Sequence, residues 1–220
     1  MFAGLVTLGS WQLQRRAWKL DLIARIEARV RAPAVAVPSH DRWPGIDATG
    51  DEYRRVRASG VYRRDADTFV QAVTARGAGF WVLTPLQLAD GSALLVNRGF
   101  VPPEARARVA PPAGPIDVTG LLRLTEPGGG FLRRNDPVAN RWFSRDVQAI
   151  GAARGLANLA PYFVDADTGP ADAAPPVGGL TVVAFSNNHL VYAITWYTLA
   201  LMIAAATWRL MREEPRAEHD

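Results

Sequence analysis

"SNNHLVYAITWYTLALMIAAATW" occupies residues 186–208 and decides the fold class of this chain. No charged side chain occurs from Leu190 to Trp208. A helix of these 19 residues, at roughly 1.5 Å per residue, is about 28 Å long, close to the roughly 30 Å apolar thickness of a bilayer. The stretch therefore predicts a transmembrane helix.

Aromatic and basic residues flank this stretch as they flank membrane-spanning helices. Its first half contains three aromatic residues, Tyr192, Trp196 and Tyr197. Trp208 ends the stretch, and Arg209 and Arg212 follow, which places the carboxyl end in the cytoplasm. The alternative is a buried core helix, because three consecutive alanines, 204–206, dilute the hydrophobicity.

The amino end carries a second, shorter apolar segment. "MFAGLVTLGSWQLQ" precedes Arg15, and it is too short to span a bilayer and lacks the basic start of a signal peptide. We expect the chain to begin inside a truncated first transmembrane helix. The alternative is a helix lying in the headgroups, since Trp11, Arg15, Trp18 and Leu22 share one helical stripe.

The middle of the chain changes from helical to strand periodicity. Helical spacing continues from Leu13 to Val30 and stops before Pro33. Alternating or β-branched runs then predict strands at 55–62, 68–73, 80–88, 93–101, 118–124, 162–165 and 180–185. The turn "DGS" between the third and fourth runs predicts a hairpin, and Ser144 is expected to start a short helix.

Together these patterns predict a membrane α+β protein. A small antiparallel β-barrel or sandwich is flanked by an N-terminal, truncated helix and a C-terminal transmembrane helix. The expected division is a membrane or interfacial helix at 1–30, a periplasmic β-rich domain at 31–186, a transmembrane helix at 187–212 and a polar cytoplasmic tail at 213–220.

Composition excludes several classes of function. The 220 residues include no cysteine, so disulfides, thiolate metal sites and covalent haem attachment through cysteine cannot occur. The net charge is +4, but the basic residues are scattered and form no arm for nucleic acid. Neither His40 nor His219 lies in a catalytic or metal-binding motif, and Asp136 before Pro137 predicts a turn.

His189 stands at the start of the predicted transmembrane helix. Asn187 or Asn188 suits the N-cap, and His189, Tyr192 and Trp196 then follow one another at helical spacing. An imidazole at the membrane surface above aromatic rings can ligate a lipophilic metal macrocycle. On the residues alone, a polar anchor at the interface remains the alternative.

Five stretches together resemble one known family: "LGSWQLQRRAWK" at 8–19, "YRRVRASGVY" at 53–62, "LLVNRGFVP" at 94–102, "NDPVANRWFSRD" at 135–146 and "NNHLVYAITWYTLA" at 187–200. In this order they are similar to the surfeit locus protein 1 family of cytochrome c oxidase assembly factors. The resemblance implies a multi-pass membrane protein with a transmembrane helix at each end and its β-rich domain on the periplasmic or intermembrane-space side. Short loops and an Ala/Arg-rich composition indicate a bacterial source, hence the inner membrane and the periplasm, and no residue constellation indicates an enzyme.

The resemblance also implies a cargo and partners. The cargo is haem a, bound transiently, with His189 as ligand of the haem iron; Tyr192 and Trp196 follow as pocket neighbours by helical spacing. The partners are the catalytic subunit of cytochrome c oxidase, the haem a synthesis machinery and the lipid bilayer. A haem-independent scaffold that stabilises an oxidase intermediate is the alternative. Gly60 and the run Asn97, Arg98 and Gly99 match family motifs and are interpreted as barrel geometry.

Overall fold

The computed structural model describes residues 1–130, 132–169, 175–181 and 187–213. The chain forms two compact units, which are taken in turn. One comprises Ala28–Val182, and the other comprises Met1–Glu27 together with Val183–Asp220.

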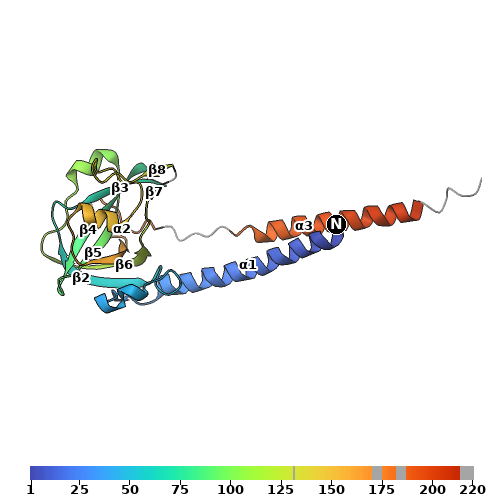
Figure 1. Cartoon of the computed structure of the whole chain (residues 1–220), viewed down its shortest axis with the longest axis horizontal. Helices are drawn as coiled ribbons and strands as arrows, with labels where there is room; N and C mark the ends of the chain where they lie inside the picture. Colours follow the sequence, from blue (N-terminus) through green and yellow to red (C-terminus); the bar gives the residue numbers. More distant parts are fainter. Residues whose placement is uncertain (131, 170–174, 182–186, 214–220) are drawn as a thin grey trace, which may run out of the picture. The chain divides into compact units, whose positions relative to one another are not determined.

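The β-rich unit is built around a closed barrel. Its main strands are β1 (Val35–Ala36), β2 (Arg55–Tyr62), β3 (Thr68–Thr74), β4 (Gly77–Leu88), β5 (Ala93–Val101), β6 (Pro115–Leu124) and β9 (Leu159–Ala166). They form one sheet in the order β1-β2-β6-β9-β5-β4-β3, and β2 also pairs with β4. The pairing of β2 with β4 closes β2, β6, β9, β5 and β4 into a ring (Figure 1).

Shorter elements complete this unit. They are the 3₁₀ helices η1 (His40–Gly45) and η2 (Pro103–Arg108), the two-residue strands β7 (Gly129–Gly130) and β8 (Arg133–Arg134), and the helix α2 (Val147–Ala153). The barrel interior is apolar, with Val56, Leu94 and Leu122 fully buried. A second cluster joins Ile150 of α2 to Phe163 of β9, so α2 packs on the barrel wall.

The predicted hairpin and the predicted barrel glycine are both confirmed. Gln87 pairs with Ala93 across the turn, and β4 and β5 run antiparallel. Gly60 lies at the seam where β2 meets β4. A Cβ atom there would approach the carbonyl oxygen of Gln87 to 2.3 Å, so only glycine allows the two strands to close the barrel.

Two predictions about the β-rich unit are wrong, and a third lies mostly outside the described residues. The strands are not all antiparallel, because β9 returns to the sheet after α2 and lies parallel to β5. The helix does not start at Ser144: Asp146 is its N-cap and accepts the Ala149 N–H, while the Ser144 hydroxyl donates to the carbonyl of Glu126. In the predicted strand 180–185, Leu180 and Thr181 do not form a strand, and residues 182–185 lie outside the described residues.

The second unit contains the two long helices. These are α1 (Phe2–Arg31) and α3 (His189–Glu213). The start of α1 lies beside α3, and the two helices run antiparallel (Figure 1). The helical spacing read from Leu13 to Val30 is therefore part of one longer helix.

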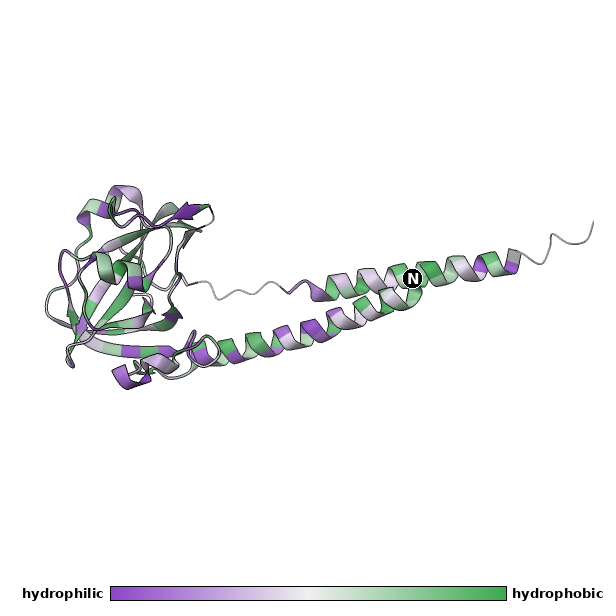
Figure 2. Ribbon diagram, viewed as in Figure 1, coloured by the Kyte–Doolittle hydropathy of each residue, from purple (hydrophilic) through white to green (hydrophobic). Residues whose placement is uncertain are grey.

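In the described part of the chain, α3 is the one helix long and apolar enough to cross a membrane. Only 11% of its most apolar window is buried, whereas a core helix would be mostly buried, so the core-helix alternative is wrong. Figure 2 shows that α3 consists largely of apolar residues, whereas bands of polar residues interrupt α1. A membrane span in α1 remains a prediction.

Candidate functional site

The two long helices make a tight contact at Gly9. This glycine is buried, and a Cβ atom built on it would lie 2.9 Å from ring atoms of Tyr197. The neighbouring Ser10 places its hydroxyl 3.0 Å from the Tyr197 hydroxyl. Small residues with a hydroxyl pair are a common way to join helices in lipid, so this contact fixes α1 against α3.

The contact face of α3 is narrow. Ala193 and Ala200 are buried, and both lie on the same face as Tyr197. Outside this face, α3 exposes many large apolar side chains, among them Leu190, Val191, Ile194, Leu199, Leu201 and Met202. A continuous apolar surface of this kind marks contact with a membrane or another protein.

His189 is the first residue of α3 and is held by a residue of α1. Its Nδ1 atom lies 2.7 Å from the Oε1 atom of Gln12. An amide oxygen only accepts hydrogen bonds, so Nδ1 carries the proton and donates it. In the neutral ring the other nitrogen, Nε2, then holds a lone pair, which is the form of imidazole that binds a metal ion.

Nε2 of His189 has no hydrogen-bond partner among the described residues. The ring is half-buried, so it is neither sealed in a core nor fully solvated. Within the same described ranges, no three His, Cys, Asp or Glu side chains gather as a metal site. A haem needs only one or two ligands from protein, because the macrocycle occupies the other iron positions.

The other predicted site residues lie further along α3. The Tyr192 side chain is 54% exposed, and Trp196 is half-buried. Both follow His189 at helical spacing, and their role as neighbours of a cofactor remains a prediction. The structure adds three residues that the sequence reasoning missed: Gly9, Ser10 and Gln12. All three belong to the stretch 8–19, so that motif could have pointed to them.

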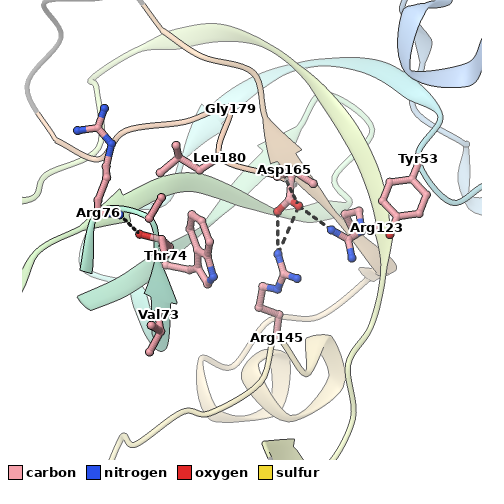
Figure 3. Close-up of a pocket in the computed structure, with 12 residues that line it drawn as sticks. Tyr53, Val73, Thr74, Arg76, Arg123, Arg145, Asp165, Gly179 and Leu180 are labelled. Carbon is pink, nitrogen blue, oxygen red and sulfur yellow. Dashed lines mark hydrogen bonds and ion pairs between the residues drawn. The ribbon is translucent and has the colours of Figure 1, made fainter. Parts of the chain in front are cut away.

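A separate cavity of about 440 Å³ lies in the β-rich unit (Figure 3). Its floor is the carboxylate of Asp165, which is 3% exposed. Figure 3 shows Arg123 and Arg145 pointing at this carboxylate, at 3.1 Å each, and Asn97 and Thr181 donate to it at 2.7 and 2.8 Å. Four residues donate to the two carboxylate oxygens, so Asp165 is the centre of a buried hydrogen-bond and ion-pair network.

Glu126 extends this network at the surface. Burial acts to raise its pKa, but the hydrogen bonds and charge of Arg145, with the charge of Arg123, outweigh burial and hold the pKa below its ordinary value. Arg145 also lies over the ring of Phe163, 4.7 Å from its centre. The carboxylates of Asp165 and Glu126 therefore balance the charges of Arg123 and Arg145 at the cavity floor. This ionic network connects β9 to the segment before α2.

The turn expected at Asp136 is confirmed, and Asp146 also has a structural role. Asp136 accepts the Ala139 N–H within a turn and pairs with Arg141, while Asp146 caps α2. Gly99 has a φ of +126°, and a Cβ atom on it would collide with the backbone of Val177. Asn97 binds Asp165, and Arg98 lies 3.8 Å from Asp67.

Comparison with known proteins gives a consistent assignment. The model of the SURF1 family matches residues 1–201. "Surfeit locus protein 1" of Mus musculus is 36% identical over 213 residues, which cover 87% of this chain and 67% of the relative. The Homo sapiens protein of that name is 35% identical over 215 residues, covering 88% and 69%. "SURF1-like protein" of Monosiga brevicollis is 32% identical over 227 residues, covering 94% and 83%. The matched range contains α1, the barrel and the first part of α3, and the chain belongs to the SURF1 family.

Proposed function

We propose that this chain is a non-enzymatic assembly factor for a haem-copper cytochrome c oxidase. It binds haem a and hands it to the catalytic subunit at the outer face of the inner membrane. One observation carries the proposal. His189 is the first residue of an apolar helix long enough to cross a membrane, and its Nε2 atom has no hydrogen-bond partner among the described residues.

The position of His189 suits a cargo that is dissolved in lipid. Haem a is apolar over most of its surface, and its iron accepts an imidazole nitrogen. With α3 in the bilayer, a ring at its first residue lies where the apolar core meets the headgroups. Tyr192 and Trp196 supply aromatic surface along the same side of the helix, and the exposed Tyr192 is open to a planar ligand.

The site also suits transient binding. A single imidazole, that of His189, would give the iron one bond to protein. A cargo held in this way can leave when an acceptor offers stronger ligation. The partners of such a cycle are the haem a synthesis machinery as donor and the oxidase catalytic subunit as acceptor.

The proposed topology follows from the end of α3. Arg212 lies over the ring of Trp208, 3.8 Å from its centre, which forms an aromatic and basic anchor. This anchor belongs on the cytoplasmic side, and a span of α3 then puts the β-rich unit in the periplasm. Fusing a reporter at Gly128 tests this: activity of a cytoplasmic reporter there contradicts the topology.

The function is tested by purifying the full chain from cells that produce haem a and recording its absorption spectrum. We expect bound haem a in the unchanged protein and none in His189→Ala. The matched control is His40→Ala. This change also removes an imidazole, but one whose ring centre lies 4.5 Å from that of Trp43 in the β-rich unit. Absence of haem from the unchanged protein, or equal haem in His189→Ala, would contradict the proposal and favour a haem-independent scaffold.

A further inference from the structure

We propose that Gln12 is a positioning residue that sets the tautomer and orientation of His189 for metal binding. The inference rests on the proposed function, because it assigns a second residue to the same haem site. Gln12 does not touch the cargo; it acts through the imidazole that does.

The geometry of the pair is specific. Gln12 Oε1 accepts a hydrogen bond of 2.7 Å from His189 Nδ1, across 177 residues of chain. A neutral imidazole without a partner exchanges its proton between the two ring nitrogens, so the ligating lone pair is only sometimes on Nε2. By accepting a hydrogen bond from Nδ1–H, Gln12 favours the neutral tautomer whose lone pair is on Nε2. Partners of this kind also fix the direction in which a metal-binding ring points.

The chemistry of an amide fits this position better than that of a carboxylate. Gln12 brings a strong acceptor without bringing a charge to the boundary of the apolar layer, where an unpaired carboxylate is costly. An amide also leaves the imidazole neutral in character, whereas a carboxylate partner draws the proton away and makes the ring a stronger electron donor. Glutamine therefore favours an imidazole–iron bond of moderate strength. A carrier needs such a bond because it has to release its cargo.

The helix contact holds Gln12 in place. Gly9 is one turn away on α1 and lets that helix approach the ring of Tyr197, while the hydroxyls of Ser10 and Tyr197 meet at 3.0 Å. These contacts fix α1 against α3 close to the point where Gln12 reaches His189. In many metal sites a ligating side chain is oriented by hydrogen-bonded neighbours that do not touch the metal, and Gln12 has this relation to His189.

The first test needs no cargo. Nitrogen-15 NMR of the haem-free full chain in detergent, with labelled histidine, reports which ring nitrogen carries the proton. We expect His189 to be protonated at Nδ1 in the unchanged protein and in Gln14→Leu. Gln14 is the matched control, being an exposed glutamine on the same helix. In Gln12→Leu, the Nε2-protonated form should appear. Protonation of His189 at Nε2 in the unchanged protein overturns the proposal.

The second test uses haem itself. We expect Gln12→Leu to weaken haem binding by about 10-fold to about 100-fold, the usual effect of removing a support group of a metal ligand, and Gln14→Leu to bind as the unchanged protein does. Gln12→Glu should retain binding and lower the midpoint potential of the bound haem, because it strengthens donation from the imidazole. A purely structural contact would not move the potential.

The outcomes separate this inference from the proposed function. If His189→Ala binds haem as the unchanged protein does, the proposed function is wrong. If His189→Ala loses haem while Gln12→Leu keeps full affinity and an unchanged potential, the proposed function stands and the role of Gln12 is wrong.

Discussion

The Nδ1 atom of His189 lies 2.7 Å from the Oε1 atom of Gln12, so residues near opposite ends of the chain meet at one point. The first helix supplies the acceptor and the last helix supplies the imidazole. The candidate site is therefore a property of the helix pair, and changes that separate α1 from α3 should disturb it without touching either residue.

Gly9→Ala tests this dependence. The added methyl group would lie 2.9 Å from the ring of Tyr197, so α1 has to move or the ring has to turn. We expect the Nδ1-protonated population of His189 to fall in the NMR measurement. Gly4→Ala is the control, because a Cβ atom at Gly4 meets no atom within 4 Å. Equal His189 spectra for the two variants would show that the helix contact does not support the site.

Ser10 and Tyr197 should be energetically coupled. A double-mutant cycle of Ser10→Ala and Tyr197→Phe isolates their hydroxyl contact at 3.0 Å. Hydrogen bonds between membrane helices contribute about 0.6 kcal/mol on average, and we expect a coupling free energy of that size. The coupling free energy is calculated from the free energies of unfolding of the four proteins of the cycle, measured in detergent. A coupling of zero would mean that the hydroxyls do not interact.

Asp165→Ala should destabilise the β-rich unit severely. The change leaves the charges of Arg123 and Arg145 without their shared buried partner, and breaking such a pair costs about 3–5 kcal/mol. Asp167→Ala removes a half-exposed partner of Arg55 on the same segment and should cost at most about 1 kcal/mol. Urea unfolding of the full chain, followed by near-ultraviolet circular dichroism, measures both. Similar midpoints for the two variants would rule out a buried ionic network.

Glu126 predicts an acid-sensitive component of stability. Its pKa in the folded protein lies below the ordinary 4.5, because Arg145 and Arg123 outweigh the effect of burial. The group therefore stabilises the fold fully above about pH 4.5 and loses this contribution as the pH falls through the folded pKa. Glu126→Gln should flatten the loss of stability in that acid range. An unchanged pH profile of the unfolding midpoint would contradict the assignment.

Much of the β-rich unit could be predicted from local patterns. The bounds of β2 and β5 coincide with the runs 55–62 and 93–101. Buried and more exposed residues largely alternate along β2, whereas β5 is a mostly apolar run that is buried on both faces, and both patterns are typical of strands. The crowding at Gly60 was also predictable from its motif. The place of β9 beside β5 was not, since parallel pairing depends on a crossover that no local pattern records.

The candidate site divides in the same way. His189 was predicted because its position at the start of an apolar segment is visible in one stretch of sequence. Gln12 was not, since a glutamine in an apolar helix carries no local signal of its partner 177 residues away. The ionic network around Asp165 was missed for a similar reason: its donors come from β5, β6, the segment before α2 and Thr181.

The central claim is that the Nε2 atom of His189 is a ligand of haem iron. The direct measurement is a haem titration of purified His189→Gly, followed by absorption, with and without added imidazole, and with His40→Gly as control. We predict that His189→Gly fails to bind haem alone and regains the spectrum of the unchanged protein when imidazole fills the vacated space. Binding by His189→Gly without imidazole, at the affinity of the unchanged protein, would contradict the claim.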